Sequence, residues 1–160
     1  QSTITFINNL TRYAGIVASW CAGLLVLVVI YDILMRYLFK LSTPWIMELE
    51  WHLFSILFLL GAAYTFQQDK HVRVDLFYSK LSPIEQARVN LFGNLFFLLP
   101  WCIFIVIYAF DYAHASYVIG ESSPDPGGLP YRFIVKSFIV LGFILLALQA
   151  TAIPYNVFKY

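Results

Sequence analysis

Charge is scarce in this chain of 160 residues. Lys, Arg, Asp and Glu together make up 12% of the sequence, well below the roughly 25% of an ordinary soluble domain. Hydrophobic residues account for 61%, and the mean hydropathy is +0.75. The formal net charge is only +1, which argues against a nucleic-acid partner. This composition is typical of a membrane protein.

Residue patterns that carry chemistry are also missing from the sequence. It has no Gly-rich phosphate loop, no Cys and His set at metal-ligand spacing, and no nucleophile beside a base. Cys21 and Cys102 each follow a Trp inside an apolar run and are expected to act as small buried hydrophobes. The first apolar run is too long for a cleavable signal peptide. We therefore predict that the chain is not an enzyme and holds no cofactor or metal.

Four apolar runs are long enough to cross a bilayer. A helix rises about 1.5 Å per residue and the hydrocarbon core is about 30 Å thick, which the runs at 13–39, 45–66, 88–117 and 131–158 satisfy. The connections between them are too short and too polar to build a second core. The sequence predicts an all-α integral membrane protein with four transmembrane helices in a single domain, residues 1–160.

The distribution of Lys and Arg predicts the orientation of the bundle. The segment 67–88 contains four of these residues, whereas the loop 118–131 contains none. Cytoplasmic loops are enriched in Lys and Arg. Both termini are therefore expected in the cytoplasm.

Local signals predict where the helices begin. "SPIE" at 82–85 is a capping box that should start the third helix. "TPW" at 43–45 repeats the cap-then-proline pattern for the second helix, and "GGLP" at 127–130 repeats it more weakly for the fourth. Pro100 is expected to kink the third helix because it has no backbone N–H to donate.

The segment 67–82, between the second and third runs, is too polar to span a membrane. Its apolar residues recur at roughly helical spacing with Lys and Arg on other faces, which favours a short interfacial amphipathic helix. A solvated loop is the alternative, because the alternation in "HVRVD" also suits an extended stretch.

Ionisable residues gather in "YDILMRYLFKLSTPWIMELEWH", residues 31–52. Asp32 and Arg36 are four residues apart on one helix face and can pair there. Glu48 and His52 form a polar stripe on the second helix. Because a tight connection makes the two helices antiparallel neighbours, we also predict that Arg36 pairs with Glu48.

A second group of ionisable residues is expected at the same level of the membrane. Asp111 and His114 lie near the end of the third run, and Arg132 and Lys136 near the start of the fourth. We predict that Lys136 or Arg132 neutralises Asp111. His52 and His114 both fall toward this side, so a bis-histidine haem is an alternative. A lone His on a membrane helix more often satisfies a neighbouring carboxylate or the backbone.

The centres of the four runs contain no ionisable residue: "CAGLLVLVV", "SILFLLG", "LLPWCIF" and "LGFILLALQ". Four helices without a polar midpoint cannot carry a carboxylate or a cation across a membrane. We interpret the charges at the edges as groups that neutralise one another and support assembly, in preference to an ion path. A bundle of this kind is expected to work by holding another protein.

Four motifs, in their order and spacing, resemble the small membrane subunit (DctQ-like) of tripartite ATP-independent periplasmic (TRAP) transporters, and the resemblance covers nearly the whole chain. The motifs are "RYLF" (36–39), "TPWIMEL" (43–49), "LGAAY" (60–64) and "HVRVDLF" (71–77). The positions that match the family are Arg36, Trp45, Glu48, His71 and Asp75. The chain departs from the family where Met47 replaces the first of two acids, and Glu50 is an additional one.

This resemblance implies a scaffold subunit in a bacterial inner membrane. Its partners would be a large multi-spanning permease subunit, which binds substrate and sodium, and a periplasmic substrate-binding protein that captures an organic acid. The alternative is a free-standing four-helix membrane protein that binds a haem or a lipid. Assembly is expected to depend on Asp32, Arg36, Trp45, Glu48, His52, His71, Asp75, Asp111 and Lys136.

Overall fold

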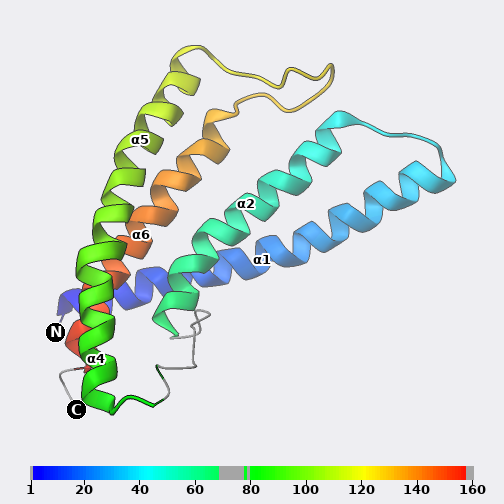
Figure 1. Ribbon diagram of the computed structural model, residues 1–160. Coiled ribbons are helices and arrows are strands. Elements are labelled where there is room, and N and C mark those ends of the chain that lie inside the picture. Colours follow the sequence, from blue (N-terminus) through cyan, green and yellow to red (C-terminus); the bar gives the residue numbers. More distant parts are fainter. Residues whose placement is uncertain (1, 69–77, 79, 158–160) are drawn as a thin grey trace.

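The computed structural model of the protein describes residues 2–68, 78 and 80–157 (Figure 1). All regular structure in these residues is helical. Four helical stretches are long and apolar enough to cross a membrane: Ser2–Leu38, Pro44–Gln67, Pro83–Val118 and Phe133–Ala152. The predicted all-helical fold with four membrane-spanning helices is confirmed.

The helices are α1 (Ser2–Leu38), α2 (Pro44–Gln67), α4 (Pro83–Gly93), the π-helix η1 (Asn94–Leu98), α5 (Leu99–Val118) and α6 (Phe133–Val157). Helix α1 begins well before residue 13, where the apolar run starts, because the polar residues ahead of that run are also helical. Most of the segment 67–82 lies outside the described residues, so the interfacial helix stays a prediction.

The three predicted helix starts differ in outcome. Ser82 and Glu85 form the capping box, with the Ser82 N–H donating to the Glu85 carboxylate at 2.8 Å. Thr43 precedes α2 as predicted, but its side chain makes no capping hydrogen bond. The prediction for the fourth helix is wrong. Tyr131 has a φ of +63°, outside the helical region, and α6 begins only at Phe133.

The third span contains a π-helical turn directly before Pro100. Helix α4 continues into η1, and α5 follows with this proline in its first turn. Pro100 has no N–H for the usual bond to the carbonyl one turn earlier. A wider π turn on its N-terminal side accommodates the missing bond within a continuous span.

The helices pack in the order α1, α2, α6, α5 (Figure 1). The antiparallel pair α1–α2 is the first hairpin and the antiparallel pair α5–α6 the second; α2 and α6 join them. We call the end where α1 begins and α6 finishes the terminal end. The opposite end, with the connections 39–43 and 119–132, is the loop end. The connection 119–132 reaches from the second hairpin toward the start of α2 (Figure 1).

Small residues let the helices approach one another closely. A Cβ atom on Gly142 would lie 2.9 Å from the Leu59 carbonyl oxygen, and one on Gly15 would lie 2.5 Å from the Tyr64 ring. Close backbone approach of this kind is typical of membrane helix pairs. The buried core beside these contacts consists of Ala18, Leu60, Ala63 and Leu145.

Candidate functional site

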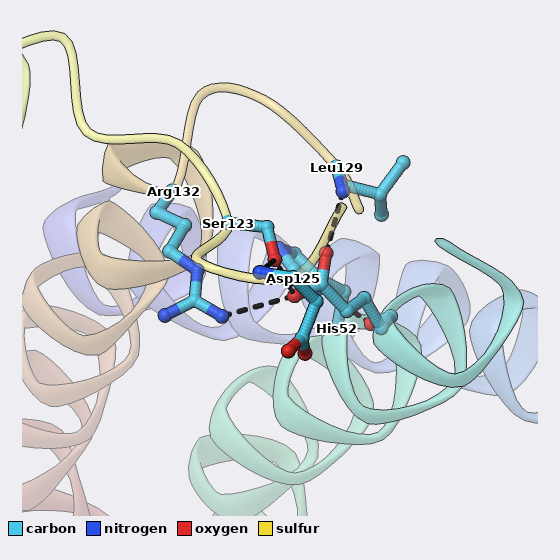
Figure 2. Close-up of polar contacts among 6 residues, drawn as sticks. His52, Ser123, Asp125, Leu129 and Arg132 are labelled. Atoms are coloured by element: carbon cyan, nitrogen blue, oxygen red, sulfur yellow. Dashed lines mark hydrogen bonds and ion pairs between the residues drawn. The ribbon is translucent and has the colours of Figure 1, made fainter. Parts of the chain in front are cut away.

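Glu48 is the centre of a polar cluster at the loop end. It lies on α2, is only 4% exposed, and accepts hydrogen bonds from three groups of the second hairpin. Oε1 accepts from Ser123 Oγ at 2.5 Å and from Arg132 Nη2 at 3.0 Å. Oε2 accepts from the backbone N–H of Leu129 at 2.5 Å. Figure 2 shows Ser123, Leu129 and Arg132 converging on this point. We call these four residues the Glu48 clamp.

The connection 119–132 is folded so that its donors face α2. The Ser123 N–H donates to the Leu129 carbonyl at 3.1 Å, which brings the two residues of the clamp side by side. Ser123 Oγ also accepts from the Asp125 N–H at 3.1 Å, a side-chain turn typical of Ser. These local bonds present a hydroxyl and an N–H together to one carboxylate.

Two glycines permit this loop conformation. Gly127 has a φ of +82°, which favours Gly over residues with a Cβ. At Gly128, a Cβ atom would collide with the Ser123 side chain and lie 2.8 Å from Glu48 Oε2. The backbone therefore approaches the carboxylate at a place where only glycine fits without a shift.

A second ion pair lies beside the clamp. The Lys136 ammonium donates to the Glu121 carboxylate and lies 3.9 Å from the centroid of the Tyr112 ring. The hydrogen bond from Lys136 holds the pKa of Glu121 below its ordinary value. The Arg132 guanidinium lies 5.8 Å from the centroid of the Trp51 ring. Both cations are thus balanced by a carboxylate and covered by an aromatic ring.

The predicted pair between Arg36 and Glu48 is wrong. Arg36 Nη2 instead donates to Asp32 Oδ2 at 2.5 Å, the intrahelical pair that the spacing predicted. Asp32 is 4% exposed, so this pair neutralises a buried carboxylate on α1. Glu48 takes its cation from Arg132 in the second hairpin. The local pair forms because a partner one turn away costs little side-chain ordering.

The predicted neutralisation of Asp111 is also wrong. Asp111 lies on an exposed face of α5, and the two cations proposed for it are held by Glu48 and Glu121. The prediction considered only α5 and α6, whereas the carboxylates that capture these cations come from α2 and the connecting loop.

The two histidines at the loop end do not face each other. His52 Nδ1 lies 2.6 Å from the Glu48 carbonyl oxygen, and its ring lies 3.9 Å from the Trp51 ring. His114 lies on α5, with its ring stacked on Phe110. Helix α6 packs between α2 and α5. Among the described residues, no group of three His, Cys, Asp or Glu could hold a metal. The geometry gives a bis-histidine haem no support.

The remaining predicted site residues have separate places. Trp45 lies in the first turn of α2, is 40% exposed, and shares a shallow pocket with residues of α1. His71 and Asp75 lie outside the described residues, so their proposed roles stay predictions.

A neutral polar network at the terminal end was not anticipated. Thr11 Oγ1 donates to Gln149 Oε1 at 3.1 Å, and Gln149 Nε2 donates to Asn8 Oδ1 at 3.1 Å. Gln67 Nε2 donates to the Asn8 carbonyl at 3.1 Å, so the network joins α1, α2 and α6. Gln149 stands inside an apolar run, and a side-chain amide in such a run needs a partner. That signal was available in the sequence.

The clamp residues Ser123 and Leu129 were also missed. The loop "GESSPDPGGLPY" is visibly rich in turn-forming residues. Its composition does not show which carboxylate on another helix it will meet, because that depends on how the hairpins pack.

Comparison with known proteins addresses the family. A family model of tripartite ATP-independent periplasmic transporters, DctQ component, matches residues 25–159. A putative TRAP transporter small permease protein of Haemophilus influenzae is 24% identical over 137 residues, covering 85% of this chain and 82% of that protein. The match to the family model includes α2, the connection 119–132 and the Glu48 clamp. The chain therefore belongs to the DctQ family, the small membrane components of TRAP transporters.

Proposed function

We propose that this chain is a non-catalytic scaffold subunit of a sodium-coupled TRAP importer of organic acids. The observation that carries the proposal is the absence of ionisable side chains from the middle of the spans. In the described helices, Asp, Glu, Lys, Arg and His are missing from 13–31, 53–67, 89–110 and 137–157. A charge held at mid-bilayer without partners costs about 2.5 to 3.5 kcal/mol. Substrate and sodium are therefore expected to cross through another subunit.

Exposed aromatic side chains on α5 support the scaffold role. Trp101, Phe104 and Tyr108 stack along one face, with ring centroids 5.9 Å and 4.5 Å apart, and all three are about half exposed or more. Helices in a membrane associate largely through van der Waals packing of such faces. We propose that the large permease subunit packs on the exposed apolar surface of this bundle.

The loop end is proposed to face the periplasm, with both termini in the cytoplasm of a bacterial cell. The supporting observation is that the loop 118–131 contains no Lys or Arg. The Glu48 clamp gives the connection 119–132 a defined conformation. A loop held in this way suits a docking surface for the periplasmic substrate-binding protein.

The assembly residues are proposed to act by keeping the bundle in shape. Asp32 and Arg36 neutralise each other on α1, while Glu48 and Lys136 take part in the two ion pairs of the loop end. His52 contacts the backbone at Glu48. None of these roles requires contact with the transported solute.

Reconstitution tests the proposal. The chain should co-purify in equal amounts with a large multi-spanning permease subunit, and a sodium gradient should drive organic-acid uptake only when both subunits and the binding protein are present. Liposomes that contain this chain alone serve as the matched control. Sodium-driven accumulation of an organic anion in those liposomes, or full-rate uptake by the large subunit without this chain, would contradict the scaffold role.

A further inference from the structure

A pocket of about 220 Å³ lies between the two hairpins at the loop end. Its walls come from three helices: Trp51, Ser55 and Leu59 of α2, Tyr112 of α5, and Val135, Lys136 and Ile139 of α6, with Arg132 directly before α6. The polar and aromatic members lie toward the loop end, and the aliphatic members toward the middle of the bundle. Leu59 lies about 12 Å along α2 from Trp51. The pocket therefore changes from charged to apolar over the depth of a membrane interface.

The cations of this pocket have donors that the protein leaves unused. Arg132 donates through Nη2 to Glu48, but its Nε is buried and has no hydrogen-bond partner in the described part of the chain. Figure 2 shows the second terminal nitrogen of Arg132 directed away from the clamp. A buried donor without a partner costs about 1 to 3 kcal/mol. An acceptor that enters the pocket and reaches this guanidinium would remove that cost.

The chemistry of the walls selects the acceptor. An arginine presents two adjacent N–H groups that match two oxygens of a phosphate. The Lys136 ammonium lines the same pocket and carries further donors. Trp and Tyr rings, such as those of Trp51 and Tyr112, are enriched at the depth of lipid headgroups. Basic pockets between membrane helices bind such headgroups.

The charge balance narrows the class of lipid. Arg132 and Lys136 are already matched by Glu48 and Glu121, so the surroundings of the pocket carry no net charge. A headgroup with both a phosphate and an amine adds none. Its phosphate suits the two cations, and its ammonium suits the partly exposed Glu121 carboxylate.

From this geometry we infer a binding site for one zwitterionic, amine-bearing phospholipid. Its phosphate contacts Arg132 and Lys136, and its acyl chains run over Leu59 and Ile139. The lipid touches both hairpins and so adds a third connection at the loop end, beside the two ion pairs. This site is independent of the scaffold role, because it needs no partner subunit.

Native mass spectrometry of the full chain in detergent, titrated with phosphatidylethanolamine, tests the site. Ile139→Trp fills the apolar part of the pocket and leaves every charged group in place. Ile30→Trp makes the same change on α1 at a residue that is 49% exposed and outside the pocket. We expect one tightly bound lipid on the wild type and on Ile30→Trp, and binding weaker by about tenfold or more on Ile139→Trp.

Additional arms distinguish lipid binding in this pocket from a loss of folding, from general attraction of anionic lipid and from binding of free phosphate. Ser55→Phe fills the same pocket from α2 and should also weaken binding, which keeps the test valid if Ile139→Trp unfolds; melting curves and circular dichroism check each variant. Equal binding by the wild type and a folded pocket-filling variant would overturn the proposal. So would tighter binding of phosphatidylglycerol than of phosphatidylethanolamine, or complete displacement of the lipid by inorganic phosphate.

Discussion

The two ends of the bundle join the same helices with different chemistry. At the loop end, the hairpins are connected by a buried carboxylate, Glu48, with Arg132 and two neutral donors of the connecting loop. At the terminal end they are connected by neutral side chains, with Gln149 between Thr11 and Asn8. Gln149 and Glu48 are 1% and 4% exposed, so both are withdrawn from their surroundings to a similar degree.

This difference concerns how much depends on one residue. A buried carboxylate forms strong charge-assisted bonds, but it becomes an uncompensated charge when its partners are removed. A neutral amide gains less from each bond and loses less when a partner is missing. The loop end should therefore be sensitive to single substitutions, whereas the terminal end should lose stability in small steps.

Glu48→Gln should have the largest effect. It removes the charge that balances Arg132, and loss of one partner of a buried ion pair costs about 3 to 5 kcal/mol. Thermal unfolding in detergent would measure the loss, and hydrogen exchange would show faster exchange at the Leu129 N–H. Asp111→Asn makes the same chemical change at an exposed site and should have almost no effect. Similar melting temperatures for the two variants would remove the special role assigned to Glu48.

Gly128→Ala should weaken the same end by a steric route. The added methyl group would lie 2.8 Å from Glu48 Oε2 and would collide with Ser123. Overpacking of this kind costs about 1 to 3 kcal/mol. Gly23→Ala is the matched control, because no atom lies within 4 Å of its Cβ position. Replacing this helical glycine should be neutral or stabilising by about 0.5 to 1 kcal/mol. Equal stability changes in the two variants would show that the close approach at Gly128 is not required.

A double-mutant cycle should give a smaller value at the terminal end. Thr11→Val and Gln149→Leu remove the two partners of one buried hydrogen bond. Interhelical bonds of this type contribute on average about 0.6 kcal/mol in a membrane protein. Thr151→Val serves as control, since Thr151 Oγ1 bonds locally to the Leu148 carbonyl and its cycle with Thr11→Val should show no coupling. A coupling as large as the Glu48 effect would erase the contrast between the two ends.

The ion pair of Glu121 should make the smallest contribution, and it should depend on pH. Lys136 lowers the pKa of Glu121 in the folded state, so the pair stabilises the fold above the unfolded-state pKa. That contribution is lost as the pH falls through the folded-state pKa. Glu121→Gln should flatten this part of the curve of melting temperature against pH, while Asp125→Asn should leave it unchanged. An identical acid response in wild type and Glu121→Gln would assign the response to other groups.

Much of the fold follows from signals that act over a few residues. Apolar length predicts the four spans, "SPIE" predicts the capping box at Ser82, and four-residue spacing predicts the pair of Asp32 with Arg36. These features form because their partners are already neighbours along the helix, so little chain entropy opposes them. The start of α6 was predicted wrongly from a glycine and proline pattern that belongs to the loop ahead of it.

The partners of Glu48, Arg132, Lys136 and Asp111 depend on packing between hairpins that are far apart in the sequence. Each cation had more than one carboxylate within reach of a reasonable prediction. The choice was made when α6 packed against α2 and the glycines of the connecting loop allowed its N–H groups to reach Glu48. Ion pairs act over short distances and depend on burial, so a shift of one helix changes which charges meet.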